Sequence, residues 1–219
     1  MFDFVKDIED GLKKYPLLHW STTGSEKLVE GTFNAHKSNI EIERYEVRIG
    51  FSKTYPYDTP WVIETSNKIY PRNATRHIFI DDTLCFGNRQ DVLRVCKNGI
   101  TFKWFLDKIL NPHLCREYVK DKTGEYPTGE RSHGTEGTWE GYYEIFRTNN
   151  KAKILKELER LLTYPTFARN KECYCNSGKK YKRCHEKWLP LIFDIGRINV
   201  KKLYLEMKND FELRQNKLK

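Results

Sequence analysis

The sequence predicts an α+β fold, and two patterns lead to this prediction. Apolar residues recur at helical spacing near both ends of the 219-residue chain, whereas residues between them alternate with the two-residue period of a half-buried strand. The expected order is a helix, a run of antiparallel strands, a long loop region and then further helices. This order lacks the regular strand–helix alternation of a doubly wound parallel sheet.

The first helix is expected over residues 2–14, with acidic residues in its first turn and Pro16 after its end. Strands are expected over residues 28–33, 40–42, 45–51 and 61–65. The alternation changes phase near Glu43 and Arg44, which predicts either a bulge or a turn at that point. Residues 66–100 show no regular pattern.

The second half of the chain is expected to be mainly helical. A short helix over residues 101–110 has Thr101 as its cap and is expected to stop at Asn111-Pro112. Residues 120–141 are rich in Gly and polar residues and predict a long loop. Helices are also expected before Pro165 and over residues 188–214, the first with this apolar face: Ile154, Leu155, Leu158, Leu161 and Leu162.

The net charge of +9 is confined to the last third of the chain. Residues 1–150 carry 21 Lys and Arg against 22 Asp and Glu, whereas residues 151–219 carry 18 against 8. This step predicts one domain over residues 1–148 and a basic helical extension over residues 149–219. The extension either meets an acidic partner or is simply a solvated surface, and the sequence leaves both open.

No apolar run approaches the length of a membrane span, and the first 20 residues lack the apolar core of a signal peptide. We therefore expect a cytoplasmic protein without a membrane partner. In a reducing compartment the six cysteines are expected to be metal ligands, nucleophiles or buried thiols rather than disulfides.

A cluster of metal-binding residues lies in "CYCNSGKKYKRCH" of the basic extension. Cys173, Cys175, Cys184 and His185 offer three thiolates and an imidazole, a donor set for tetrahedral Zn²⁺. The run resembles the SEC-C zinc motif, in which CxC is followed after eight residues by Cys and His. That resemblance implies a small accessory module that docks to proteins.

Cys85 follows the strand-like run "RHIFIDDT" and precedes "FGN". The two aspartates before it and the Gly-Asn pair after it predict an exposed polar turn, in which a thiol gains little from packing. An exposed thiol is available as a nucleophile. Cys96 and Cys115 each have apolar neighbours and are expected to be packed, although Cys96, eleven residues after Cys85, is its main rival as the nucleophile.

The order of segments around Cys85 resembles the ubiquitin-conjugating enzyme (UBC) fold over roughly residues 1–148. A "YPYDTP" loop, a strand and "IYPRN" precede the cysteine, as a proline-rich loop, a strand and a His-Pro-Asn segment do in that family. Thr75-Arg76-His77 stands where His-Pro-Asn is expected. The loop "PTGERSHGTEG", residues 127–137, is similar instead to bacterial UBC-like domains of antiviral defence operons, including cyclic-oligonucleotide signalling systems.

The resemblance implies that Cys85 is a catalytic residue that forms a thioester. His77 stands where the family keeps an asparagine that supports the reaction centre, and is expected to act as an oxyanion donor or a base. Asp82 and its neighbour Asp81 are candidates for orienting a lysine amine, although paired aspartates more often shape a turn. His133 is a further candidate, equally well explained as a solvated loop residue.

The expected function is that of a UBC-like acyltransferase in bacterial antiviral defence. Its partner is expected to be a protein with a C-terminal glycine, and the resemblance points to a cyclic-oligonucleotide-producing nucleotidyltransferase. The chain has no room for an adenylating domain, so either a separate activating enzyme acts first or none is needed. The alternative is a non-catalytic adaptor that docks partners through its zinc-binding tail. Nucleic-acid binding is weakly supported, because the aromatic residues lie mostly outside the basic tail.

Overall fold

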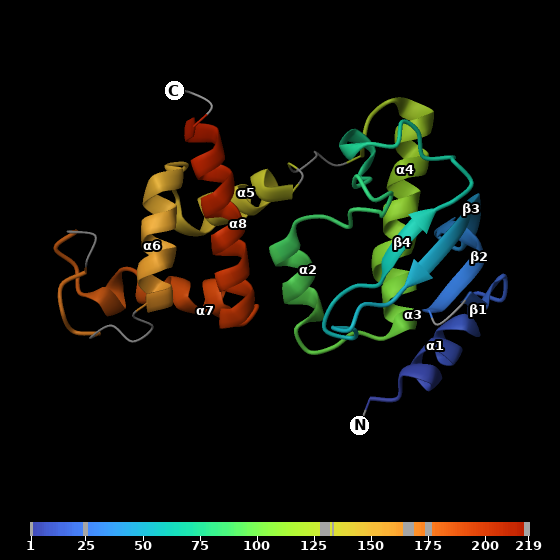
Figure 1. Ribbon diagram of the computed structural model, residues 1–219, viewed down its shortest axis with the longest axis horizontal. Helices are drawn as coiled ribbons and strands as arrows, with labels where there is room; N and C mark the ends of the chain where they lie inside the picture. Colours follow the sequence, from blue (N-terminus) through green and yellow to red (C-terminus); the bar gives the residue numbers. More distant parts are fainter. Residues whose placement is uncertain are drawn as a thin grey trace. The chain divides into compact units, whose positions relative to one another are not determined.

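The chain forms two compact units in the computed structural model (Figure 1). The structure describes residues 2–23, 26–127, 132, 134–163, 169–173 and 177–216. The first unit comprises Met1–Gly87 and Val95–Glu130, and the second comprises Asn88–Arg94 and Arg131–Lys219. The first unit contains the sheet and the second is helical, so the predicted α+β class is confirmed.

A four-stranded antiparallel sheet forms the body of the first unit. Its strands follow the chain in the order β1 (Leu18–Thr23), β2 (Glu26–Lys37), β3 (Ile40–Gly50) and β4 (Trp61–Glu64). The helix α1 (Phe4–Leu12) precedes it and is capped by Asp3, which accepts a hydrogen bond from the Lys6 N–H at 3.1 Å. The sequence pattern missed β1 and predicted the other three strands.

The phase break predicted near Glu43 is a bulge inside one continuous strand. Ala35 of β2 pairs with Glu43 of β3 and His36 pairs with Glu41, which leaves Ile42 as the extra residue. The strand therefore continues without a turn. Beyond the bulge the predicted alternating residues are buried: Tyr45, Val47 and Ile49.

One long helical segment packs against β2 and β3. It consists of α3 (Phe102–Phe105), the π-helical η2 (Leu106–Leu110) and α4 (Asn111–Thr123), which follow one another directly. Thr101 caps it as predicted, accepting from the Trp104 N–H at 3.1 Å. The stop predicted at Pro112 is wrong. Pro112 lies at the start of α4, directly after the π-helical turn, where a missing N–H is tolerated.

The core of the first unit lies between this helical segment and the sheet. Its fully buried side chains include Phe33, Tyr45, Phe102, Phe105 and Leu110. Asn111 fixes the segment to β2, because its side chain bonds the backbone N–H and C=O of His36 at 2.8 and 3.0 Å.

The second unit is a helical assembly around one apolar core. Its helices are α5 (Gly134–Phe146), α6 (Lys151–Thr163), α7 (Leu189–Phe193) and α8 (Arg197–Asn216), to which α2 (Arg89–Cys96) adds Leu93. The predicted face of α6 is buried at Ile154, Leu155, Leu158 and Leu161. The helix expected over residues 188–214 is divided instead, and Gly196, with φ of 83°, lies at the break.

The two units divide before α5, whereas the step in charge placed a boundary at residue 148. Trp139, Tyr142 and Phe146 of α5 belong to the second core, which explains why this helix joins the second unit. The long loop predicted over residues 120–141 is thereby corrected, because α4 extends to Thr123 and α5 begins at Gly134.

Within the described part of the chain, no helix combines the length and the apolar character that crossing a membrane requires.

Candidate functional site

Cys85 stands at the end of a tight hairpin rather than after a full strand. Ile78 pairs with Leu84 across the hairpin, and the Cys85 N–H donates to the His77 carbonyl at 2.6 Å. The Leu84 N–H donates to the Val62 carbonyl at 2.7 Å, which attaches the hairpin to β4. The predicted strand "RHIFI" is thus replaced by a turn and one arm of this hairpin.

The two aspartates shape the tip of the hairpin. Asp81 accepts hydrogen bonds from the backbone N–H and the hydroxyl of Thr83, at 3.1 and 2.6 Å. Asp82 adopts a left-handed φ of 65°. Phe79 and Ile80 at the same tip point away from the core and are exposed. These contacts agree with the turn-shaping role of the aspartates.

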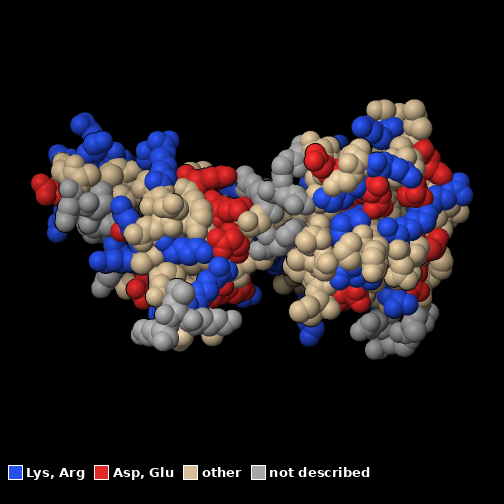
Figure 2. All heavy atoms as spheres, turned by 90° about the horizontal axis from the view of Figure 1, so that it is seen from above, with Lys and Arg blue, Asp and Glu red and all other residues tan. Residues whose placement is uncertain are grey.

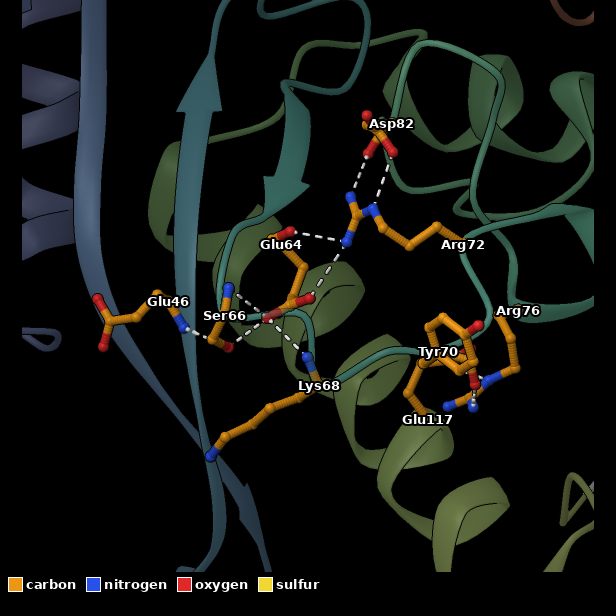
Figure 3. A network of polar contacts seen from close by, with 9 residues as sticks. All are labelled: Glu46, Glu64, Ser66, Lys68, Tyr70, Arg72, Arg76, Asp82 and Glu117. Carbon is orange, nitrogen blue, oxygen red and sulfur yellow. Dashed lines mark hydrogen bonds and ion pairs between the residues drawn. The ribbon is translucent and has the colours of Figure 1, made fainter.

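Asp82 also belongs to an ion-pair network that holds the loop after β4 (Figure 3). Arg72 Nε lies 2.8 Å from Asp82 Oδ1, and Arg72 Nη1 donates to the Glu64 carbonyl at 3.0 Å. The buried Glu64 carboxylate accepts from the Ser66 N–H at 2.8 Å and lies 3.4 Å from Arg72. Asp82 is therefore held by Arg72, and among the described residues none of its contacts directs it toward Cys85.

A second ion pair holds the other end of the same loop. Arg76, the last residue of η1 (Ala74–Arg76), places Nε 2.9 Å from Glu117 Oε2 and Nη2 2.7 Å from Asp121. Tyr126 donates to the other Glu117 oxygen at 2.6 Å. Burial raises the pKa of the Glu117 carboxyl, and the bonds from Tyr126 and Arg76 oppose that rise.

The Cys85 thiol is buried, so the expectation of an exposed turn is wrong. The residue is 4% exposed, and its Sγ lies 3.7 Å from the Gly87 carbonyl. Burial raises the pKa of the thiol against the opposing effect of the Arg116 cation, so the resting thiol is protonated near neutral pH. The prediction of an exposed turn from its polar residues failed because Asn88 is itself buried, with its side-chain amide donating to the Gly137 carbonyl.

His77 lies beside the hairpin as predicted, but its ring packs with other rings. It is half-buried, with a left-handed φ of 51°. Its ring centroid is 5.9 Å from that of His113 and 5.1 Å from that of Tyr126. The contact to Cys85 is made by its backbone carbonyl.

His113 on α4 is a candidate site residue that the sequence analysis missed. It is 1% exposed, and its ring packs 5.3 Å from Phe86, the residue after Cys85. Burial, with contributions from Arg116 and His77, holds its pKa well below the usual range. Within the described residues its Nε2 has no hydrogen-bond partner. The sequence signal for His113 was weak: the residue lies directly after Pro112, where a helix end was predicted.

The remaining predicted residues divide into two groups. Cys96 is fully buried, and Cys115 is half-buried with its Sγ 3.4 Å from the His36 carbonyl, so each fits a packed thiol. His133 of the Gly/His loop and Cys175 of the zinc cluster lie outside the described residues.

A second candidate site is a hairpin between α6 and α7. Glu172 pairs with Lys180 across it, and the Cys173 N–H donates to the Lys179 carbonyl at 2.7 Å. The short helices η3 (Tyr181–Arg183) and η4 (Glu186–Trp188) follow. This path brings two sulfurs and a ring nitrogen within 4.8 Å of one another, from Cys173, Cys184 and His185.

These three side chains fit a zinc ion. In a tetrahedral site with Zn–S bonds of about 2.3 Å, neighbouring donors lie about 3.8 Å apart, which is compatible with three donor atoms that all lie within 4.8 Å of one another. Burial, with the Arg160 and Lys153 cations, lowers the pKa of His185 to about 4, which keeps the imidazole neutral for metal binding. A bound ion would cross-link Cys173, in the hairpin, to Cys184 and His185, which follow η3.

Comparison with known proteins identifies the same segment. The model of the SEC-C motif matches residues 169–187, which confirms the predicted zinc-binding motif. Two curated relatives are the protein translocase subunits SecA of Borreliella afzelii and Borrelia garinii subsp. bavariensis, each 45% identical over 38 residues. The match covers 17% of this chain and 4% of each relative. No solved structure matches the chain.

The variant Arg76→Met should strongly destabilise the first unit. It leaves the buried Glu117 carboxylate without its cation, and removing one partner of a buried pair costs about 3–5 kcal/mol. Urea unfolding followed by circular dichroism measures this change in the free energy of unfolding. Arg44→Met removes an exposed pair with Glu41 and should leave the midpoint unchanged. Equal shifts in the two variants would contradict the importance of the Arg76 pair.

His113 should make the protein less stable as the pH falls from 7 to 5. Its folded pKa lies below the unfolded value of about 6.5, so the unfolded chain binds the proton first. The free energy of unfolding then decreases by up to about 1.4 kcal/mol per pH unit. Urea unfolding at pH 7, 6 and 5 should show a shallower slope for His113→Phe. Parallel slopes would mean that His113 titrates normally.

The chain purified under reducing conditions should contain one zinc ion, measured by plasma mass spectrometry. Cys184→Ser should lower the zinc content well below one equivalent because it removes a ligand. Cys115→Ser, a thiol of the first unit, is the matched control and should keep the metal. Zinc retained by Cys184→Ser, or lost equally by both variants, would argue against this ligand set.

Proposed function

We propose that the protein is a ubiquitin-conjugating-enzyme-like acyl carrier of bacterial antiviral defence, with Cys85 as its nucleophile. Its substrate is a partner protein with a C-terminal glycine. A nucleotidyltransferase that makes cyclic oligonucleotides is the partner that the family resemblance favours. The acceptor is an amine, such as that of a lysine side chain.

The order of elements around Cys85 is the observation that carries this proposal. α1, four antiparallel strands in sequential order, the Cys85 hairpin and the helical segment ending in α4 follow in the order that the UBC resemblance implies. Arg72 and Arg76 hold the loop before the hairpin at two points through the buried carboxylates of Glu64 and Glu117. A nucleophile benefits from such a rigid backbone, because its geometry is then fixed before substrate binds.

The proposed chemistry has two acyl-transfer steps. The Cys85 thiolate attacks the carbonyl carbon of the activated C-terminal glycine, so that a C–S bond forms and the activating group leaves. The amine then attacks the thioester, so that a C–N bond forms and the thiolate is released. Each step passes through an oxyanion that a hydrogen-bond donor can stabilise. In this proposal the chain carries out the acyl transfer, and a separate enzyme activates the C-terminal glycine of the partner protein.

The raised pKa of the Cys85 thiol is compatible with a carrier. A thiol of higher pKa gives a more nucleophilic thiolate and a poorer leaving group, so its thioester resists hydrolysis. Such a thiol needs a base when the partner binds. Among the described residues the Nε2 of His113 has no hydrogen-bond partner, and His77 is its neighbour, so these two residues are the candidates for that role.

The burial of Cys85 favours a second candidate function. At 4% exposure the thiol becomes reachable only if the residues that cover it move. A non-catalytic adaptor requires no such movement. In that case the first unit binds a partner, and the zinc-binding second unit serves as a docking module.

A thiol-sensitive adduct on Cys85 is expected when the protein is co-expressed with its partner and an activating enzyme. Intact mass spectrometry after an acidic, non-reducing quench measures the added mass. The adduct should be absent in Cys85→Ala, because the acyl group has lost its sulfur. Cys85→Ser should carry an adduct that resists thiols and is removed by alkali, since an oxygen ester forms instead.

Cys96→Ala is the matched control, because it removes the other buried thiol of this region and should retain the adduct. An adduct that survives Cys85→Ala would exclude Cys85 as the carrier. The adaptor function predicts a different pattern: no adduct on any variant, unchanged activity in Cys85→Ala and loss of activity in Cys184→Ser.

A further inference from the structure

A cavity of about 240 Å³ adjoins the zinc hairpin within the second unit. It lies between α6 and the chain that carries the metal ligands. Ser177 and His185 line one side of it, and Lys153 and Ile154 line the other. The cavity is smaller than the roughly 300–1,000 Å³ of a typical small-molecule site. It matches one large side chain better than a cofactor.

The cavity has an aromatic wall that is built from three rings in series. His185 packs edge-on against Trp188, with 4.0 Å between centroids, and Trp188 packs edge-on against Phe146 at 5.1 Å. Ile154 completes the apolar surface. Because His185 is a candidate zinc ligand, binding of the metal would fix the position of this wall.

An unpaired cation stands at the edge of the cavity. Lys153 is exposed, and within the described residues its ammonium forms no ion pair or hydrogen bond. Residues 151–219 carry ten more basic than acidic residues, and Lys and Arg side chains are scattered over the part of the chain drawn at the left of Figure 2, with Asp and Glu between them. The surroundings of the cavity therefore attract a negatively charged ligand.

We propose that this cavity binds an acidic peptide segment by inserting one large apolar side chain. The side chain fills the space between Phe146, Ile154 and Trp188, and a neighbouring carboxylate of the peptide pairs with Lys153. The hairpin with its zinc ion forms the wall that includes His185. This binding site is independent of acyl transfer and applies whether Cys85 is a nucleophile or not.

The chemistry of the cavity favours a peptide over a nucleic acid. Glu157 lines the same cavity, with its carboxylate 3.4 Å from Arg160, so the cavity itself takes the apolar side chain and the carboxylates of the peptide lie outside it, at Lys153. The rings of Phe146 and Trp188 meet at 80°, so they form a corner rather than the parallel faces on which successive bases stack. A peptide side chain needs neither a phosphate site nor a stacking face.

Fluorescence anisotropy with labelled pentapeptides tests the proposal on the full, zinc-loaded chain. The probes are Glu-Glu-Phe-Glu-Glu, its Ala-centred version and Lys-Lys-Phe-Lys-Lys. Glu-Glu-Phe-Glu-Glu should bind about tenfold or more tightly than the Ala-centred peptide, because an aromatic side chain is buried. The Lys-flanked peptide should bind more weakly than both. Chelation of the zinc should abolish the preference for Phe.

Substitutions at two exposed lysines distinguish binding in the cavity from general electrostatic attraction to the basic unit. Lys153→Glu should weaken binding of Glu-Glu-Phe-Glu-Glu by about two- to fivefold. Lys156→Glu makes the same change on the same helix outside the cavity and should have a smaller effect. Thr148→Trp places a large ring at the cavity and should remove the preference for Phe over Ala. Absent binding, equal affinity for the Phe and Ala peptides, or a preference that survives Thr148→Trp would overturn the proposal.

Discussion

Two buried glutamates determine the conformation of the segment that carries Cys85. Glu64, at the end of β4, holds Arg72, and Glu117, on α4, holds Arg76. Burying a carboxylate is unfavourable unless a cation and hydrogen bonds compensate, so each glutamate requires its arginine in place. The irregular chain between β4 and the hairpin is thereby tied to the sheet at one end and to the helix at the other. Without regular secondary structure, these ion pairs give the loop its shape.

The strands and helices with strong periodicity were predictable because burial imposed the pattern. Tyr45, Val47 and Ile49 face the core on every second residue, and the α6 leucines do so at helical spacing. β1 was missed because its sequence, "LHWSTT", alternates only once, at Leu18 and Trp20, before polar residues follow. The helix through Pro112 was missed because the chain inserts a π-helical turn, a tertiary feature without a sequence signature.

The candidate sites show the same distinction. The zinc-binding motif was predictable because metal coordination needs particular residue types at close spacing, and the family match confirms the motif. The structure brings three of the four predicted ligands together: Cys173, Cys184 and His185. The burial of Cys85 was not predictable from its neighbours, since the polar residues around it are used inside the fold. Asn88 illustrates this: its amide satisfies a buried carbonyl rather than water. His113 was missed because it becomes a site residue only through the packing of α4 against Phe86.

The π-helical turn at Leu106–Leu110 also acts as a phase shift for everything that follows it. Each residue of an α-helix advances its side chain by about 100°, so one residue accommodated in a wider turn rotates the whole of α4 relative to α3 by about that angle. With the offset, α3 contributes Phe102 and Phe105 to the core, while α4 directs His113 and Glu117 toward the loop and the hairpin. One helical segment thus contacts both the core and the loop before the Cys85 hairpin. The number of residues in the π-helical turn, more than their composition, determines which side chains of α4 reach the loop.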